Sequence, residues 1–245
     1  MIPPDPRGPL TPAERIICAL DLPTLPMALS LMDTLGGNVR WFKIGMELFT
    51  REGPRTVEEV LRRGAGVFLD LKYHDIPATA ERAVVSAGTL GVSLLTVHAS
   101  GGSAMLEACV RGRDACPNPP AVLAVTVLTS LDQAALAAMG IVRTLEEQVL
   151  ASAELAWQAG LDGVVASPRE VAALRRCLGN EALIVTPGVR IGGGSQDDHA
   201  RAETPQRAIA DGADLLVVGR PIRDAADPAA AARAFAEAAA QGVRT

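Results

Sequence analysis

The chain has 245 residues, of which 49% are apolar, and this suits a large domain with a sizeable core. Its net charge of −5 and its pI near 5.3 argue against a surface that binds nucleic acid or an anionic membrane. The apolar runs are only as long as strands, which argues against a transmembrane helix.

The N-terminal stretch MIPPDPRGPLTP is rich in proline and lacks an apolar segment. We expect residues 1–12 to form a flexible tail rather than a signal peptide, and residues 13–245 to form one domain. The four cysteines include no CxxC pair, so we expect reduced thiols, a cytoplasmic protein and no metal site.

Eight short apolar runs alternate with stretches of helical spacing along the chain. They are continuous and rich in Val, Ile and Leu, as strands buried on both faces are. This alternation predicts a parallel α/β sheet, and eight units predict a single (β/α)8 TIM barrel. The runs are residues 15–21, 39–45, 66–72, 92–98, 121–129, 163–167, 182–188 and 214–220.

Several predicted helices carry signals at their ends. A proline opens and a glycine closes 54–64, and Thr144 and Glu147 have the spacing of a capping box. The Ala-rich stretch 228–242 predicts a final helix. A doubly wound open sheet is the alternative fold, but the turn after the first run, DLPTLP, lacks the glycines that usually mark it.

Polar residues follow the apolar runs at the ends where TIM barrels carry their active sites. Any one of them alone can be an ordinary loop residue. Together they predict a polar site at one mouth of the barrel. They are Asp21, Lys43, Asp70, Lys72, His98, Thr129, Ser130, Pro187, Arg190, Gly219 and Arg220.

The stretches after the last two runs, 187–205 and 219–222, correspond to loops that often bind phosphate in such barrels. Gly219 would let a backbone N–H approach a phosphate oxygen, and Arg220 offers a bidentate fork. The glycines at 192–194 suit a loop that closes over a ligand. The alternative is a merely flexible loop and a surface ion pair of Arg220. We expect a phosphorylated small molecule.

Only two of the 23 lysine and arginine residues are lysines, Lys43 and Lys72. Lysine can release its proton in a protein, whereas arginine cannot. Lys72 stands two residues after Asp70, so both face one side of a strand, and Asp75 follows in the loop. An ammonium group held between carboxylates suits protonation of a carbanion-like centre. The alternative is that the charges only neutralise one another.

The stretch 67-VFLDLKYHDIP-77 resembles the DxKxxD signature of orotidine 5′-phosphate decarboxylases, through Asp70, Lys72 and Asp75. The resemblance extends over most of the chain, from residue 14 to 225, and its motifs fall at the ends of the predicted strands. The other matching stretches are 20-LDLP-23, 42-FKIG-45, 97-VHASGG-102, 124-AVTVLTS-130, 186-TPGVR-190 and 218-VGRPI-222.

The resemblance implies conversion of orotidine 5′-monophosphate to UMP and carbon dioxide, the last step of de novo pyrimidine synthesis, without a metal or organic cofactor. It implies that Lys72 delivers the proton to C6 and that Asp70 lies near the departing carboxylate. It implies that Lys43 and Asp21 hold the ribose. It also implies a homodimer in which Asp75 reaches into the partner's site.

The resemblance implies further contacts to the pyrimidine, the ribose and the phosphate. These substrate-binding residues are Thr79, Thr129, Ser130, Pro187, Arg190, Gly219 and Arg220. Related sequences usually carry a glutamine in the phosphate loop where this chain has His199, with Gln196 as the alternative. An imidazole there would carry a charge that varies near neutral pH.

Two other functions remain open. A magnesium-dependent sugar-phosphate decarboxylase or aldolase of the same superfamily shares the DxKxxD array. Such enzymes have a glutamate just before the signature, where this chain has Val67, Phe68 and Leu69. A non-catalytic barrel that binds a phosphate ligand is the other alternative, although it would not need both lysines and both acids.

Overall fold

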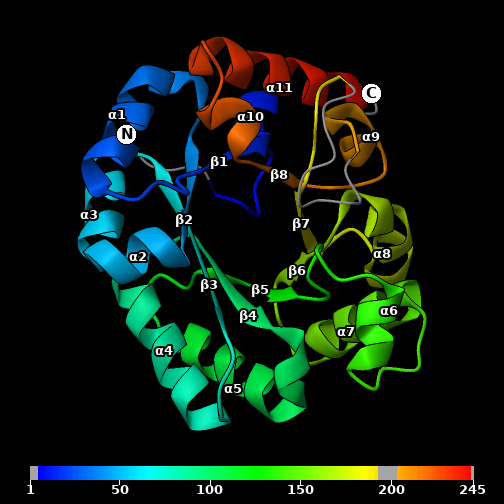
Figure 1. The fold of residues 1–245 in the computed structure, drawn as a ribbon. Coiled ribbons are helices and arrows are strands. Elements are labelled where there is room, and N and C mark those ends of the chain that lie inside the picture. The colour runs from blue at the N-terminus through cyan, green and yellow to red at the C-terminus, as the bar shows by residue number, and fades with distance from the viewer. Residues whose placement is uncertain (1–4, 193–202, 244–245) are drawn as a thin grey trace.

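A computed structural model describes residues 5–192 and 203–243. Within them, eight parallel strands form a closed barrel in which each strand pairs with the next and β8 pairs with β1 (Figure 1). The predicted (β/α)8 barrel is confirmed. The strands are β1 (Ile16–Ala19), β2 (Trp41–Gly45), β3 (Gly66–Tyr73), β4 (Leu94–His98), β5 (Ala121–Val125), β6 (Gly163–Val165), β7 (Leu183–Pro187) and β8 (Leu215–Val218).

Helices surround the barrel on its outside (Figure 1). The α-helices are α1 (Leu25–Leu35), α2 (Met46–Glu52), α3 (Arg55–Arg62), α4 (Pro77–Thr89), α5 (Gly102–Asp114), α6 (Gln133–Ala138), α7 (Leu145–Gln158), α8 (Val171–Leu178), α9 (Pro205–Ala210), α10 (Arg220–Arg223) and α11 (Pro228–Gly242). Short 3-10 turns are η1 (Pro12–Arg15), η2 (Gly36–Asn38), η3 (Ala99–Gly101) and η4 (Pro168–Glu170).

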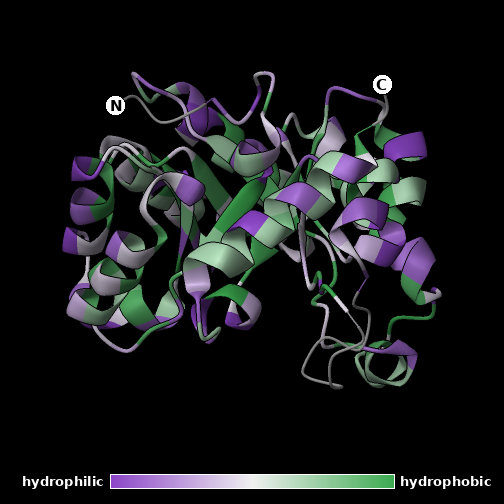
Figure 2. Cartoon of the chain, turned by 90° about the horizontal axis from the view of Figure 1, so that it is seen from above, coloured by the Kyte–Doolittle hydropathy of each residue, from purple (hydrophilic) through white to green (hydrophobic). Residues whose placement is uncertain are grey.

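Each strand falls on one of the eight predicted apolar runs, because both of its faces are covered. In β1, Ile17 and Ala19 belong to a cluster inside the barrel, whereas Ile16 and Cys18 pack against the helices outside. The central strands in Figure 2 are accordingly green, while the surrounding helices carry purple polar positions as well. Burial raises the pKa of Cys18 to about 12, which keeps it a thiol, as expected of a core residue.

The inside of the barrel is filled by a few large side chains. Trp41 is fully buried there, and burying a side chain of this kind stabilises the fold by ~2–3 kcal/mol. Gly66 on the neighbouring strand makes room for it, since a Cβ at Gly66 would lie 2.4 Å from the indole ring. The other end of the barrel interior is left for polar groups.

Helix ends follow the predicted signals. The Thr144 hydroxyl accepts a hydrogen bond from the backbone N–H of Glu147 at 3.2 Å, and the Glu147 carboxylate accepts one from the N–H of Thr144 at 2.8 Å. This is the predicted capping box of α7, which typically contributes ~1 kcal/mol. The predictions of α3 and of the final helix α11 are confirmed as well.

The described part of the N-terminal segment lies at the end of the barrel where the strands begin. Leu10 packs against the inner cluster, and Arg7 forms an ion pair of 3.0 Å with Asp162, which directly precedes β6. The flexibility predicted for residues 1–12 stays a prediction. Among the described residues, no helix combines the length and the apolar character that a bilayer span requires.

Candidate active site

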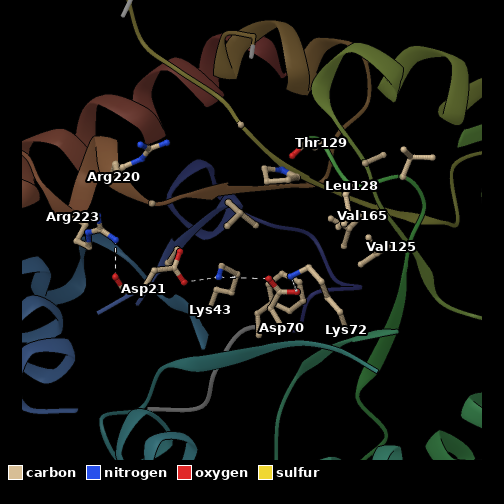
Figure 3. A pocket seen from close by; sticks show the side chains of 18 of the residues that line it. Asp21, Lys43, Asp70, Lys72, Val125, Leu128, Thr129, Val165, Arg220 and Arg223 are labelled. Carbon is tan, nitrogen blue, oxygen red and sulfur yellow. Dashed lines mark hydrogen bonds and ion pairs between the residues drawn. The ribbon is translucent and has the colours of Figure 1, made fainter. Parts of the chain in front are cut away.

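A cavity of about 420 Å³ opens where the strands end, at the mouth that the sequence predicted (Figure 3). Strands and loops from all around the barrel except β4 supply its walls. Nine of the predicted site residues line it: Asp21, Lys43, Asp70, Lys72, Thr129, Pro187, Arg190, Gly219 and Arg220. The barrel therefore brings together side chains that lie up to two hundred positions apart in the sequence.

Four charged side chains form a chain of alternating sign across the floor of the cavity (Figure 3). The Nζ of Lys43 lies 2.8 Å from Asp21 Oδ1 and 3.6 Å from Asp70 Oδ2. The Nζ of Lys72 lies 2.8 Å from Asp70 Oδ1. Each carboxylate oxygen of Asp70 therefore faces a different ammonium group.

The pKa values of the two most buried members reflect these pairings. Burial alone would lower the pKa of Lys43, but the carboxylates of Asp70 and Asp21 outweigh it and raise the pKa. Burial alone would raise the pKa of Asp70, but Lys43 and Lys72, with hydrogen bonds from Lys72 and Thr96, lower the pKa instead. Both groups stay charged at neutral pH. Two unit charges 4 Å apart interact by ~4 kcal/mol at an effective dielectric near 20, before desolvation costs.

The backbone at Lys72 is not that of a regular strand. Lys72 has φ 53, and among the described residues it is the only one other than glycine with a positive φ. The pairing of β3 with β4 shifts register between Leu69 and Tyr73. Such irregularities re-aim a side chain next to active sites, at a local cost of ~1–3 kcal/mol. The ammonium group of Lys72 meets Asp70 at this irregularity, a feature that simple period-two spacing does not contain.

Thr96 of β4 is hydrogen-bonded to both Lys72 and Asp70 at this irregularity. Its hydroxyl accepts a hydrogen bond from the backbone N–H of Lys72 at 2.9 Å and donates one to Asp70 Oδ1 at 3.0 Å. Sequence reasoning missed Thr96. The available signal was a threonine two positions before His98 in an apolar strand, which puts it on the face that looks into the barrel.

Glycine at position 45 leaves room for the Asp21–Lys43 pair. A Cβ there would lie 3.0 Å from Asp21 Oδ1 and 3.2 Å from Lys43 Nζ. At Gly219, by contrast, there is room for a side chain, because a Cβ added there would lie at an ordinary contact distance of 3.7 Å from Ala19 Cβ. A close approach of a phosphate to Gly219 therefore stays a prediction.

Three arginines also line the cavity, and Figure 3 shows two of them, Arg220 and Arg223, near the Asp21 end of the charged row. Arg220 begins α10, and Arg190 follows β7 with its guanidinium donating to the carbonyl of Val189 at 3.0 Å. Arg223 was not predicted. Its guanidinium donates to the Asp21 carbonyl at 2.7 Å and pairs with Asp224, so it ties α10 to the loop after β1.

Apolar side chains from β5, β6, β8 and the loop after β5 form an apolar wall of the cavity. A flat ring of low charge can pack against them. Sequence reasoning did not single these residues out, because apolar residues at the end of a strand look the same whether they face a cavity or the core. They are Val125, Val127, Leu128, Val165 and Val217.

Four predicted residues within the described part of the chain do not line this cavity: Asp75, Thr79, Ser130 and His98. Asp75 is exposed in the loop after β3, where its Oδ1 accepts a hydrogen bond from the N–H of Ile76 at 2.7 Å. Thr79 is half-buried in the first turn of α4, and Ser130 is exposed beyond Thr129. His199, with its alternative Gln196, lies outside the described residues.

The two other histidines lie side by side at the mouth, with ring centroids 5.5 Å apart. Burial, His74 and Lys72 lower the pKa of His98, so its imidazole is neutral at pH 7. Among residues 5–192 and 203–243, no group of three or more His, Cys, Asp or Glu side chains is placed to hold a metal ion.

Comparison with known proteins gives one consistent result. The model of the family described as "Orotidine 5'-phosphate decarboxylase / HUMPS family" matches residues 14–235. A protein of Anaeromyxobacter sp. (strain K) named orotidine 5'-phosphate decarboxylase is 52% identical over 227 residues, which cover 93% of this chain and 99% of the relative. The protein of the same name from Moorella thermoacetica is 52% identical over 229 residues, covering 91% of each chain.

A solved structure agrees with the sequence relatives. The crystal structure of orotidine 5'-phosphate decarboxylase from Lactobacillus acidophilus superposes with a TM-score of 0.83 at 37% identity. It covers 92% of this chain and 99% of its own. The chain belongs to the orotidine 5'-phosphate decarboxylase / HUMPS family.

Proposed function

We propose that this protein decarboxylates orotidine 5′-monophosphate to UMP and carbon dioxide, the last step of UMP biosynthesis. The observation that carries the proposal is the unbroken Asp21–Lys43–Asp70–Lys72 chain on the floor of a cavity that arginines also line. Relatives about half identical over nearly the whole chain are named for this activity.

In the proposed reaction the bond between C6 and the carboxylate breaks, and its electron pair stays on C6. Lys72 gives the proton that forms the new C6–H bond and then regains a proton from solvent. A lysine suits this role because its ammonium can release a proton, which a guanidinium cannot. The ammonium groups already in place stabilise the negative charge as it develops, without reorganisation during the step.

Asp70 would lie beside the departing carboxylate and keep the Lys72 ammonium aimed at C6. Its lowered pKa means that it is charged at neutral pH, so it repels the substrate carboxylate until carbon dioxide has left. Lys43 and Asp21 would bind the ribose hydroxyls.

The remaining contacts follow the shape of the cavity. Arg190, Gly219 and Arg220 would bind the phosphate, with His199 or Gln196 from the loop between β7 and α9. Energy from this remote group would serve to position the reacting end. The pyrimidine would lie against the apolar wall. Its other proposed neighbours are Thr79, Thr129, Ser130 and Pro187.

We also propose a homodimer in which Asp75 completes the partner's site. The exposure of Asp75, and its place outside this chain's own cavity, support that proposal. Ile76 beside it is 67% exposed, and Met46 on α2 is 56% exposed. Apolar residues that a second subunit would cover are exposed in this way when one chain is considered alone. A cytoplasmic location is proposed from the cysteine pattern alone.

One assay separates the candidates. Purified protein is mixed with orotidine 5′-monophosphate in EDTA, and the fall in its absorbance is followed. We expect full turnover. Turnover that is lost with EDTA and restored by Mg²⁺ would favour the sugar-phosphate relatives, and binding without turnover would favour a non-catalytic barrel.

A further inference from the structure

We propose that Thr96 is a positioning residue of the reaction, whose hydroxyl holds the Asp70 carboxylate and the Lys72 backbone in one fixed arrangement. The inference rests on the proposed function. Thr96 is fully buried and does not line the cavity, so it acts through these two neighbours rather than on a ligand.

The two hydrogen bonds of Thr96 use its hydroxyl in both directions. It accepts from the N–H of Lys72 at 2.9 Å and donates to Asp70 Oδ1 at 3.0 Å. The same Asp70 oxygen also accepts from Lys72 Nζ at 2.8 Å. One oxygen therefore has two donors, which fixes the rotation of the carboxylate and with it the direction of the lysine ammonium.

The backbone explains why a hydroxyl is needed at this position. Lys72 has a φ angle of 53°, and the register between β3 and β4 shifts around it. At this place the backbone N–H of Lys72 donates its hydrogen bond to the Thr96 hydroxyl. A conformation that a lysine rarely adopts persists only where its surroundings hold it in place. Without the hydroxyl, this N–H loses its acceptor and the lysine can relax away from Asp70.

The expected effect falls on the chemical step rather than on binding. The proposed phosphate end of the cavity lies at Arg190, after β7, and at Arg220, on α10, whereas both hydrogen bonds of Thr96 go to β3. A misplacement of a reacting group by ~1 Å can cost on the order of 100-fold in rate. Substitution of Thr96 should therefore lower kcat while leaving the affinity for ligand almost unchanged.

The test compares Thr96→Val and Thr96→Ser with Thr186→Val as a matched control. Thr186 on β7 is also fully buried, and within the part of the chain that the structure describes its hydroxyl has no hydrogen-bond partner. Each variant is measured for kcat and KM with orotidine 5′-monophosphate, for UMP affinity by calorimetry, and for Tm.

We expect Thr96→Val to lower kcat about 10- to 100-fold with UMP affinity within about threefold of wild type, and Thr96→Ser and Thr186→Val to keep kcat within about threefold. Unchanged kcat in Thr96→Val would overturn the inference. So would a loss of kcat matched by equal losses of UMP affinity and Tm, which a merely structural role predicts. A wild-type protein without turnover would overturn the proposed function itself, and this inference with it.

Discussion

The ammonium nitrogen of Lys72 lies 2.8 Å from Oδ1 of Asp70, two residues earlier on the same strand. The contact lies at an irregular part of the strand, where Lys72 has a left-handed backbone and the register of β3 against β4 shifts. The ammonium group is thereby held at the cavity floor in a fixed direction. This placement underlies the predictions that follow.

The lowered pKa of Asp70 gives a pH dependence of stability with a definite sign. Folding favours its charged form, so its contribution is full above the ordinary pKa of 3.8 and is lost as pH falls through the lower, folded value. Removing one partner of a buried pair costs ~3–5 kcal/mol, so we expect Asp70→Asn to lose about this much near pH 7. The measurement is urea unfolding across the acid range.

The gap between wild type and Asp70→Asn should begin to shrink as the pH falls below 3.8, where the unfolded carboxyl takes up its proton, and should close as the pH falls through the lower, folded pKa of Asp70. Asp33→Asn is the control, since the Asp33 side chain is 68% exposed and its pair with Arg63 is 3.4 Å long. It should change stability by less than ~0.5 kcal/mol. Parallel curves for wild type and Asp70→Asn throughout the acid range would contradict the role of Asp70 as the buried, paired carboxylate.

Gly45→Ala should damage the floor of the cavity without touching its charges. The added Cβ would crowd both Asp21 Oδ1 and Lys43 Nζ, and overpacking of this kind costs ~1–3 kcal/mol. Gly37→Ala is the matched control, because a Cβ at Gly37 meets nothing within 4 Å. We expect a lower Tm and weaker UMP binding for Gly45→Ala alone. Equal behaviour of the two variants would show that the Asp21–Lys43 pair tolerates a shift.

Arg220→Ala should lower kcat as well as raise KM. If phosphate binding supplies energy that positions the reacting end, its loss is felt in the transition state and not only in affinity. We expect a fall in kcat/KM of at least about 100-fold, shared between the two constants. Arg176→Ala, on the exposed face of α8, should behave as wild type. A change in KM alone would contradict this use of the phosphate.

Mixing Asp75→Ala with Lys72→Ala subunits tests whether sites are shared in a dimer. In a mixed dimer, one site would combine an intact Lys72 with the partner's intact Asp75. With random exchange we expect recovery of up to about a quarter of wild-type activity. No recovery after demonstrated subunit exchange would place Asp75 outside the partner's site.

Much of the fold follows from simple features of the sequence. The eight apolar runs predict the strands because a strand covered on both faces needs apolar side chains on both. The strand ends then place Asp21, Lys43, Asp70 and Lys72 at one mouth of the barrel, and the structure brings them within ion-pair distance. These predictions depend only on local pattern and on one rule about barrels.

Other features depend on contacts that local pattern does not contain. The positive φ of Lys72 coincides with the register shift between β3 and β4, and Thr96 is hydrogen-bonded to Lys72 at that irregularity. Arg223 joins the site through a contact to the Asp21 carbonyl, 202 positions away in the chain. The apolar wall around Val165 has the same composition as the core. Each of these features could be recognised only from the folded structure.

The most direct test of the account compares wild type with Lys72→Arg and Lys72→Ala in single-turnover decarboxylation of orotidine 5′-monophosphate, alongside UMP affinity. Lys72→Arg keeps the positive charge but cannot release a proton. If Lys72 is the proton donor, both variants lose at least about 100-fold in rate, whereas Lys72→Arg still binds UMP. A Lys72→Arg protein that turns over at the wild-type rate would contradict the central claim.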